Sequence, residues 1–276
     1  MNDSTAARTI VIPGANGRVG QLLRRAWEEA PLNDWRPVWC ARAPGPDIDM
    51  VWQPGEAVPL KADAVLALWG VVPRSGDLQD NVKLARAAMA LGRDCGAQRV
   101  LHLSSAAVYG PGTRLHENML CAPASDYGTD KLAMETAIAA EPGPDACALR
   151  LANVVGADSL FRSLESDAPM VIDRFANGQG PHRSYASPLG ILRAVQALLR
   201  VEILPDVINV ALPGTVSMDA LAMAAGRVFD WRAAPEGPLA EVVLDTRRLQ
   251  TLTQDKAKAE PDAIIAEWRR LRRAQA

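Results

Sequence analysis

The sequence predicts an α/β fold built on a doubly wound parallel sheet, with a small C-terminal substrate-binding subdomain. Short apolar runs alternate with amphipathic helical patterns in the first half of the chain, which is typical of βαβ units. A glycine-rich turn follows the first apolar run and leads directly into a helical pattern, as at the ligand-binding edge of such sheets. After about Gly156 the alternation becomes less regular, and there we expect the smaller subdomain.

Six apolar runs are expected to be strands, and five periodic segments are expected to be helices. In each helical segment apolar residues recur three and four positions apart, as on one face of a helix. The expected strands are Arg8 to Ile12, Pro37 to Ala41, Ala64 to Leu68, Arg99 to Leu103, Ala146 to Ala152 and Val207 to Ala211. The expected helices are Gly17 to Glu29, Asp77 to Cys95, Tyr127 to Ala140, Leu189 to Arg200 and a basic amphipathic one at Asp262 to Arg273.

Composition and charge predict an ordinary globular protein. The 276 residues are 49% hydrophobic and 22% charged, which is enough to bury a large core. The formal net charge of -2 supplies no field that would attract nucleic acid or an anionic membrane, so we expect a small-molecule partner. The cysteines and histidines are isolated from one another, which predicts neither a disulfide framework nor a metal site. They are Cys40, Cys95, Cys121, Cys147, His102, His116 and His182.

The N-terminal segment and the apolar stretches bear on localisation. Met1 to Arg8 is short and polar and contains no signal-peptide apolar region. Later apolar stretches are interrupted by charge or proline before they reach the length of a membrane span. We therefore expect a cytoplasmic protein.

The first expected strand is followed by Gly14-Ala15-Asn16-Gly17-Arg18-Val19-Gly20, which opens an apolar helix. Glycines let the backbone turn tightly and approach a pyrophosphate, and free amides at a helix start attract its negative charge. The spacing differs from the GxGxxG of dehydrogenases with the larger doubly wound fold. The loop predicts a Rossmann-type dinucleotide site; a glycine-rich turn of structural use only is the alternative. The expected cofactor-binding residues are Gly14, Asn16, Gly17, Arg18, Val19 and Gly20.

The end of the second expected strand bears on which dinucleotide binds. An acidic residue there would hold the ribose hydroxyls of NAD, but the strand ends Val38-Trp39-Cys40-Ala41-Arg42 without one. The guanidinium of Arg42, with that of Arg18 as a second candidate, suits the extra phosphate of NADP, because a guanidinium can bind phosphate in a bidentate manner. We therefore expect NADP ahead of NAD. The alternative is that Arg42 is a solvated loop residue.

Tyr127 and Lys131 lie four residues apart at the start of an expected helix, so their side chains share one face. Free tyrosine titrates near ~10, so a tyrosine base working near neutrality needs a pKa lowered by about three units, or roughly 4 kcal/mol. An ammonium group about 5 Å away supplies roughly 3 kcal/mol at an effective dielectric constant near 20, and an oxidised nicotinamide adds a second positive charge. We therefore expect Lys131 to lower the pKa of Tyr127.

Ser105 ends a buried strand at the carboxyl edge of the expected sheet, where ligands bind. There its hydroxyl would hydrogen-bond the reacting oxygen while charge develops on it. Taken singly, a strand-end serine and a tyrosine-lysine pair each have a structural interpretation. Their order along the chain after the glycine loop is harder to obtain by accident, and it makes Ser105, Tyr127 and Lys131 the expected catalytic residues.

Six segments, taken in order, give the chain a resemblance to a known family. They are Gly14 to Gly20, Leu68-Trp69-Gly70, Asn81-Val82, Ser104 to Gly110, Tyr127 to Lys131 and Leu149 to Gly156. With these motifs the sequence resembles the NAD(P)-dependent epimerase/dehydratase family, the extended branch of the short-chain dehydrogenases/reductases. The resemblance covers most of the chain and implies a catalytic triad of Ser105, Tyr127 and Lys131.

The resemblance implies further roles. Asn153 would lie near the nicotinamide or the substrate, and Arg183 would contact the nucleotide phosphates of a substrate. Asn81 would support the active site, although a helix asparagine that faces solvent is an alternative. Tyr127 would move a proton to or from a secondary alcohol while hydride passes to or from the nicotinamide. The implied neighbours of the cofactor are Leu68, Trp69, Gly70, Tyr127 and Lys131.

Positions at which this chain differs from the family pattern reduce the number of reactions that we expect it to catalyse. Sugar dehydratases of the family have Asp and Glu after the strand-end hydroxyl, where this chain has Ala106 and Ala107, so dehydration is not expected. The C-terminal part is short for a nucleotide-sugar enzyme, and the usual glycine-acid-glycine turn before Arg183 is missing. We expect an NAD(P)-dependent oxidoreductase or epimerase that acts on a secondary alcohol or ketone of a nucleotide sugar or related sugar.

Two alternatives remain at this point. The first is an NADPH-dependent reductase of a small ketone or aldehyde, which Arg42 and the short substrate region favour. The second is a regulator that senses the dinucleotide without turnover, which the intact Tyr127 and Lys131 disfavour, since a sensor needs no proton donor.

The expected organisation follows from these assignments. Residues 1–157 would form the NAD(P)-binding domain, to which 189–212 would return, and residues 158–188 and 213–276 would form the substrate-binding subdomain. The helices Asp77 to Cys95 and Tyr127 to Ala140 carry apolar residues beyond those that one sheet face requires. In relatives these helices pair across a two-fold axis, so we expect a homodimer; the alternative is packing on the sheet. The apolar residues in question are Val82, Ala85, Met89, Met134 and Ile138.

Overall fold

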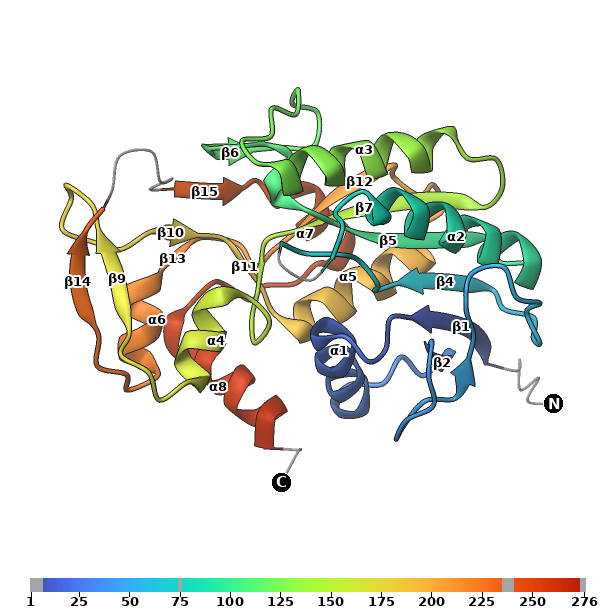
Figure 1. Ribbon diagram of the computed structural model, residues 1–276, viewed down its shortest axis with the longest axis horizontal. Helices are drawn as coiled ribbons and strands as arrows, with labels where there is room; N and C mark the ends of the chain where they lie inside the picture. The colour runs from blue at the N-terminus through green and yellow to red at the C-terminus, as the bar shows by residue number, and fades with distance from the viewer. Residues whose placement is uncertain (1–6, 74–75, 235–240, 274–276) are drawn as a thin grey trace.

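The computed structural model describes residues 7–73, 76–234 and 241–273. Residues 1–6 of the expected N-terminal segment, and residues 235–240 and 274–276 of the expected subdomain, lie outside the described residues. Within the described part the predicted fold class is confirmed: helices flank a seven-stranded parallel sheet, with smaller sheets beside it (Figure 1). None of the described helices combines the length and the apolar character needed to cross a membrane.

The large sheet has the strand order β12-β7-β5-β4-β1-β2-β3. The chain runs outward from β1 through β2 and β3, and then returns to the other side of β1 at β4. Such a reversal leaves a crevice at the carboxyl ends of the strands, where α/β proteins bind ligands. All six expected strands are present, and β3 is the additional one. The strands are β1 (Arg8–Pro13), β2 (Trp35–Ala41), β3 (Met50–Val51), β4 (Ala64–Ala67), β5 (Arg99–Ser105), β7 (Asp145–Leu151) and β12 (Val207–Val210).

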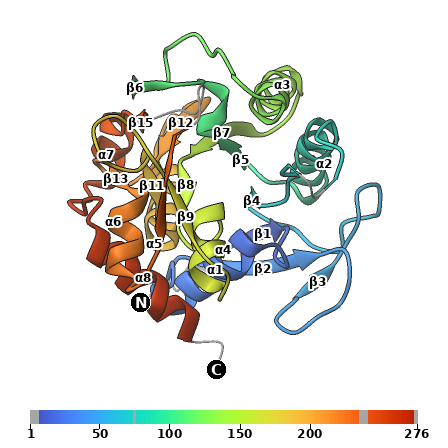
Figure 2. The same cartoon turned by 60° about the vertical axis from the view of Figure 1, so that its left-hand side comes forward.

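Helices cover both faces of the large sheet (Figure 2). α1 and α5 pack on one face, whereas α2 packs on the other with α3 beside it. All four helices were expected at nearly these positions from their apolar periodicity. They are α1 (Arg18–Glu29), α2 (Asp80–Cys95), α3 (Asp126–Ala140) and α5 (Pro188–Arg200).

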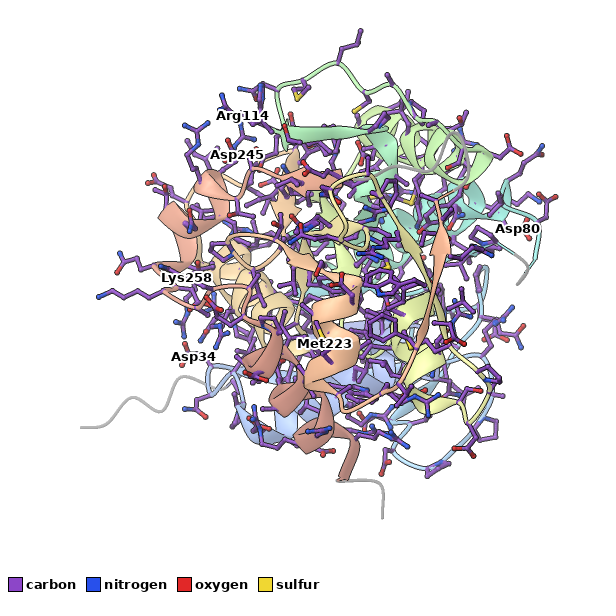
Figure 3. All side chains as sticks on the ribbon, turned by 90° about the vertical axis from the view of Figure 1, so that its left-hand side faces the viewer. Asp34, Asp80, Arg114, Met223, Asp245 and Lys258 are labelled. Atoms are coloured by element: carbon purple, nitrogen blue, oxygen red, sulfur yellow. The ribbon has the colours of Figure 1, made fainter. Side chains whose placement is uncertain are left out.

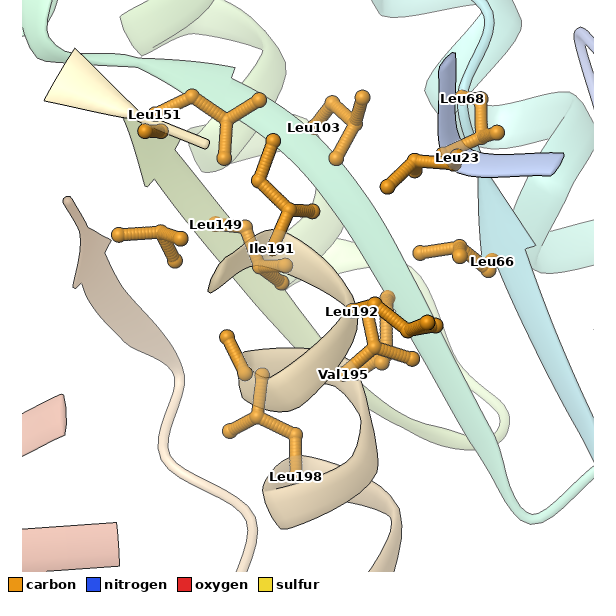
Figure 4. Close-up of a cluster of buried hydrophobic side chains, with 14 of the residues drawn as sticks. Leu23, Leu66, Leu68, Leu103, Leu149, Leu151, Ile191, Leu192, Val195 and Leu198 are labelled. Carbon is orange, nitrogen blue, oxygen red and sulfur yellow. The ribbon is translucent and has the colours of Figure 1, made fainter. Parts of the chain in front are cut away.

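The strands are apolar on both faces, as a sheet covered on both sides requires. In β1, Ile10 and Ile12 belong to the cluster under α1 and α5, while Val11 belongs to the cluster under α2. Figure 4 shows Ile191 and Val195 of α5 packed over the strand leucines in the first of these clusters. The alternation anchors the sheet from both sides and holds the strand ends rigidly where ligands bind.

α2 and α3 also pack against each other within the chain. Ala85, Met134 and Ile138 form a buried cluster between them with Val82 at its edge, and Met89 is buried against the sheet. These are the residues expected to form a dimer interface. For the four buried ones that assignment is wrong, because elements of the same chain already cover their side chains. The homodimer stays a prediction and would have to use the outer faces of the two helices.

The smaller part of the molecule contains a four-stranded sheet of order β13-β10-β15-β6 and two strand pairs, β11-β8 and β14-β9. Figure 3 looks onto this part and shows Arg114 of β6 and Asp245, just after β15, at the same edge of the molecule. Its strands are β6 (Gly112–Leu115), β8 (Asn153–Val154), β9 (Val171–Arg174), β10 (His182–Arg183), β11 (Tyr185–Ala186), β13 (Val216–Ser217), β14 (Asp230–Ala233) and β15 (Glu241–Leu244). The remaining helices are α4 (Ser159–Glu165), α6 (Met218–Ala224), α7 (Arg247–Thr253) and α8 (Pro261–Arg273), together with the short turn η1 (Ala106–Val108).

The boundary between the two parts is less simple than expected. α5 and β12 belong to the large sheet and its cover, whereas β6 lies within residues 1–157 but pairs in the smaller sheet. The proposed division into two domains stays a prediction. The last helix, α8, buries one face as expected. Ile264, Ile265 and Trp268 join the core of the smaller part, and Leu271 on the same helix is also buried.

Candidate active site

A cavity of about 840 Å³ lies at the carboxyl ends of β4, β5 and β7 and extends to the smaller part of the molecule. Its position matches the crevice that the strand order creates. Residues of the glycine loop and of the loop after β4 line it, namely Gly17, Arg18, Val19, Leu68, Trp69 and Gly70. The same cavity is lined by Ser105, Tyr127, Lys131, Asn153 and Arg183. The structure therefore brings together residues that the sequence assigned to a cofactor, to catalysis and to a substrate.

The glycine loop has the geometry of a phosphate cradle. Gly14 has a φ of +93°, and a side chain there would begin 2.4 Å from the backbone nitrogen of Trp69. A side chain at Gly20 would begin 2.6 Å from the carbonyl oxygen of Ala15, so α1 also needs glycine to approach β1. Among the described residues, no side chain caps α1 at Gly17, which leaves its first amides for an anion. These features fit the pyrophosphate of a dinucleotide, although Gly14 and Gly20 do not themselves line the cavity.

The tip of β2 lies against this loop. The amides of Gly14 and Ala15 both donate to the Cys40 carbonyl at 3.1 Å, which places the exposed Arg42 just beyond the loop. A side chain added at Gly45 would lie 4.0 Å from the amide nitrogen of Asn16, so the segment after Arg42 runs beside the loop. Arg42 and Asn16 lie outside the cavity lining.

The acidic residues that follow β2 already have protein partners. Asp49 accepts a hydrogen bond from the backbone amide of Trp39 at 2.8 Å. Asp47 lies 3.4 Å from the guanidinium of Arg24, whose side chain is largely buried. Both residues follow the tip of β2 in the chain, and the tip itself, Ala41-Arg42, carries no acid.

The start of α3 is pressed against the end of β5. Ser125 caps the helix by accepting from the Gly128 amide at 3.2 Å. A side chain at Gly128 would begin 2.3 Å from the carbonyl oxygen of Ala107, so only glycine permits this approach. The contact explains how Tyr127, on one side of it, comes within hydrogen-bond reach of Ser105 on the other. Sequence reasoning found both residues but missed the glycine between Tyr127 and Lys131 that lets them meet.

Lys131 is buried, with 3% of its surface exposed. Its ammonium donates to the Leu103 carbonyl at 3.0 Å and lies 6.0 Å from the centre of the Tyr127 ring. Among the described residues, no carboxylate lies within ion-pair distance of it. Burial lowers the pKa of Lys131 to about 8, although the charges of Asp130 and Glu135 act in the opposite direction.

Tyr127 departs from its expected protonation behaviour. Burial raises its pKa above the ordinary value, the hydrogen bond with Ser105 acts to lower it, and the charge of Asp130 raises it further. The expected lowering by Lys131 stays a prediction for the cofactor-bound protein, because in this state Lys131 is not among the causes that shift the pKa of Tyr127. The reason is geometric, since the ammonium is directed to Leu103 rather than to the phenol.

A buried ion pair lies directly behind the catalytic strand end. Arg150 of β7 binds Glu135 of α3 through two guanidinium nitrogens, with its closest contact at 2.6 Å. Ser104 donates to the same carboxylate at 2.5 Å, and Arg150 also donates to the Tyr109 hydroxyl at 2.8 Å. This network fixes the backbone next to Ser105 and so holds the serine in place.

Two further polar residues of the cavity wall were not predicted. Asp158 is half-buried, accepts from the Asn153 side-chain amide at 2.8 Å and caps α4 by accepting from the Phe161 backbone amide at 2.9 Å. Burial raises the pKa of Asp158 above its ordinary value. Arg162, one turn along α4, lines the same cavity as Arg183. An Asp followed by a short apolar helix is a capping pattern, and it was the available signal for Asp158.

Arg18 also reaches across the cleft. Its guanidinium pairs with Glu165 of α4 at 2.6 Å, which links the glycine loop to the smaller part of the molecule. Asn81, for which a solvent-facing position was an alternative, is 1% exposed and lies against the loop after β4. Within the described residues, no group of three histidine, cysteine or acidic side chains is arranged to hold a metal ion.

Comparison with known proteins places this site in context. The profile of the NAD dependent epimerase/dehydratase family matches residues 51–197. Among solved structures, MoeE5 in complex with UDP-glucuronic acid and NAD has a TM-score of 0.78 at 20% identity, over 97% of this chain and 100% of that one. UDP-glucuronic acid 4-epimerase from Bacillus cereus, in complex with UDP-glucuronic acid and NAD, has a TM-score of 0.73 at 17% identity, over 96% and 99%.

A third solved structure is UDP-N-acetylglucosamine 4-epimerase from Methanobrevibacter ruminantium, in complex with UDP-N-acetylmuramic acid. It has a TM-score of 0.75 at 18% identity, over 99% of this chain and 100% of that one. No curated protein sequence matches the chain. At these identities the structural likeness establishes the fold.

Proposed function

This chain belongs to the NAD dependent epimerase/dehydratase family, and we propose that it acts on a secondary alcohol or ketone of a nucleotide sugar or related sugar. The observation that carries the proposal is the convergence of a phosphate cradle with Ser105, Tyr127 and Lys131 on one cavity. The family consists of enzymes, and the residues that this chemistry needs are present.

The proposed reaction couples proton transfer to hydride transfer. When bound, the nicotinamide supplies the site that accepts or returns the hydride. Tyr127 takes the proton of the substrate hydroxyl, or gives it back, at its phenolic oxygen. Ser105 hydrogen-bonds the same substrate oxygen, because its hydroxyl lies within reach of Tyr127. In the cofactor-bound enzyme the positive charge of Lys131 would favour the ionised form of Tyr127, and Lys131 would also help to hold the cofactor.

Cationic side chains in the cavity wall support a phosphorylated substrate. Arg162 and Arg183 line the wall near Asn153, and Arg18 lines it near the glycine loop. Guanidinium groups bind phosphate in a bidentate manner, so these residues suit the pyrophosphate of a nucleotide sugar. The titles of the solved structures above name UDP-sugars as ligands of those proteins.

The described residues of the cavity wall lack a free acidic residue that could act as the base in a dehydration. At the end of β5 the chain has Ala106, which is buried, and Ala107, which lines the cavity. Asp158 is the acidic residue among the described lining residues, and its oxygens already accept hydrogen bonds from Asn153 and Phe161. Without a free carboxylate to remove a carbon-bound proton, epimerisation or net oxidoreduction is favoured.

We propose NADP ahead of NAD as the cofactor. The support is the position of Arg42 beyond the glycine loop and the absence of an acid at the tip of β2 among the described residues. The titles of MoeE5 and of the Bacillus cereus enzyme name NAD for those proteins. The two cofactors therefore have to be compared directly on this chain.

A substrate panel tests the proposal. Purified protein would be mixed with NAD or NADPH and either UDP-sugars or small ketones, and both the absorbance at 340 nm and the products by NMR would be followed. A new sugar epimer without net absorbance change supports epimerisation. Stoichiometric loss of NADPH with a small ketone would select the small-carbonyl reductase instead. Cofactor binding without turnover on any substrate would favour the dinucleotide-sensing regulator. In each active case Tyr127→Phe should lose the turnover and keep the cofactor.

A further inference from the structure

We propose that Asp130 is a positioning residue of the active site, which keeps Lys131 charged in its buried surroundings and ties α3 to the loop after β4 through Asn81. The proposal rests on the roles proposed above for Tyr127 and Lys131. Its first test, however, needs neither a substrate nor a cofactor, so the two proposals can fail separately.

Asp130 and Asn81 are linked by a partly buried hydrogen bond. The Asn81 amide nitrogen donates to the Asp130 carboxylate at 2.7 Å, and also approaches the carbonyls of Val71 at 2.9 Å and Leu78 at 3.0 Å. The Asn81 amide oxygen accepts from the Val71 backbone amide at 2.9 Å. Because both ends of this side chain are engaged, the orientation of the amide is fixed, and the carboxylate of Asp130 is held on the side of α3 that faces α2.

The same linkage reaches the ammonium of Lys131 at Gly70. A side chain added at Gly70 would begin 3.1 Å from the amide oxygen of Asn81 and 3.2 Å from the Lys131 ammonium. The loop after β4, the start of α2 and the catalytic face of α3 therefore meet at one point in the cavity wall. A displacement of Asn81 or Asp130 would be felt at the lysine.

The charges around Lys131 single out Asp130. On α3 the ammonium is faced by Asp130 and Glu135, which both favour its charged form, and by the neutral Tyr127. From β5 it is faced by His102, which burial keeps uncharged. Glu135 is bound by Arg150, so its charge is largely compensated. Asp130 forms no ion pair among the described residues, so its charge acts on Lys131 with the least compensation.

The charge of Asp130 also affects the phenol of Tyr127. Its charge raises the pKa of Tyr127, and it raises that of Lys131 in the same direction. Removal of this charge should therefore move both titrations toward lower pH. A residue with a purely structural role would not move the two together.

Lysine NMR gives the most direct test. The chain has five lysines, and Lys131 is the buried one, whereas Lys61, Lys83, Lys256 and Lys258 are exposed. Protein labelled with ¹³C at the lysine ε-carbon would be titrated from pH 6 to pH 11, with Lys131→Arg used to assign the signal. Asp130→Asn removes the charge and keeps an oxygen that can accept from Asn81. Asp126→Asn is the matched control, since it removes an exposed carboxylate one turn away on the same helix.

We expect Asp130→Asn to move the Lys131 titration to lower pH, while Asp126→Asn leaves it at the wild-type position. In the active enzyme both limbs of the pH–rate profile should move to lower pH in Asp130→Asn, and Asp130→Glu should restore them. An unchanged Lys131 titration in a folded Asp130→Asn protein would overturn the proposal, whatever the enzyme turns out to act on. If the lysine titration moves but no substrate is found, the proposed function has failed and the role of Asp130 in charging Lys131 has not.

Discussion

Lys131 and Arg150 are both buried cations that contact α3 or lie on it, but they differ in their partners and in the direction of their pKa shifts. Arg150 is bound by Glu135 through two nitrogens, and this partner raises its pKa. Lys131 has a backbone carbonyl as its closest oxygen, and burial lowers its pKa to about 8. Both lie against α3, because Lys131 and Glu135 occupy successive turns of that helix.

The difference separates a structural role from a chemical one. A buried charge with a complete set of partners is held in one state and positions its neighbours. A buried charge with an incomplete set costs stability but remains free to change its contacts when a ligand arrives. Two charged groups with different roles therefore meet at α3. The ion pair between Glu135 and Arg150 is a fixed anchor behind Ser105, and Lys131 is an adjustable cation beside Tyr127.

The largest effect is expected when the adjustable cation is removed. Lys131→Met should lower turnover about a thousandfold, since the proton transfer loses its electrostatic support. The same change should raise the free energy of unfolding at pH 7 by up to about 3 kcal/mol, because the folded state no longer has to keep a buried ammonium protonated.

The sign of this stabilisation can be checked by pH. The folded-state pKa of Lys131, about 8, lies below the ordinary lysine value of 10.5, so wild-type stability rises between these two pH values, because the folded protein loses the proton first. The advantage of Lys131→Met in urea denaturation should therefore shrink as the pH rises from about 8 toward 10.5. A variant that is less stable than wild type at pH 7 would contradict this account of Lys131.

The next effect concerns the fixed anchor. Glu135→Gln should lower the free energy of unfolding by at least about 3 kcal/mol, because it leaves the Arg150 guanidinium buried without its counter-charge. The double variant Glu135→Met with Arg150→Met should recover much of this loss, since no uncompensated charge remains. Denaturant unfolding of the single and double variants measures the difference. If the double variant is no more stable than Glu135→Gln, the interactions of the ion pair outweigh the free-energy cost of burying its two charges.

His102 is a third buried basic residue. It makes the free energy of unfolding depend on pH, although it has no part in the proposed reaction. Burial is the main cause that lowers its pKa to about 3 from the ordinary histidine value of 6.5, so the unfolded chain takes up its proton first as the pH falls. The contribution of His102 to the free energy of unfolding is therefore complete above pH 6.5. It is lost by about 1.4 kcal/mol per pH unit as the pH falls from 6.5 toward 3. His102→Leu should flatten the pH dependence of unfolding between pH 6 and pH 4. An equally steep loss in the variant would assign it to other groups.

The smallest effect concerns the outer end of the cofactor site. If Arg42 faces the extra phosphate of NADP, Arg42→Ala should weaken NADPH binding about tenfold and leave NADH binding unchanged. Fluorescence titration with both cofactors measures this. Equal affinities of the variant and the wild type for NADPH would make Arg42 a solvated loop residue.

Much of this arrangement could be predicted from the sequence where the signal is local. The strands of the large sheet and its covering helices follow from apolar periodicity, and Ser105, Tyr127 and Lys131 follow from a strand end and a four-residue spacing. The smaller sheet could not be predicted in this way. Its strands are two to four residues long, and β6 pairs with β15 from the far end of the chain, a contact that no local pattern specifies.

Other features depend on tertiary contacts that the sequence does not show. Periodicity marks Met134 and Ile138 as apolar, but it cannot distinguish a neighbouring helix of the same chain from a second subunit. The role of Gly128 depends on the approach of α3 to Ala107. The raised pKa of Tyr127 depends on burial and on where the Lys131 ammonium points, and the residue spacing fixes neither.

The central claim is that Tyr127, supported by Ser105 and Lys131, exchanges a proton with the substrate while hydride moves. The most direct measurement is the 340 nm absorbance of the cofactor-loaded enzyme in a stopped-flow mixer after addition of a turned-over substrate, compared between wild type and Tyr127→Phe. The account predicts a rapid absorbance change in the wild type and a change about a thousandfold slower in the variant, with equal cofactor binding in both. A variant that reacts as fast as the wild type would contradict it.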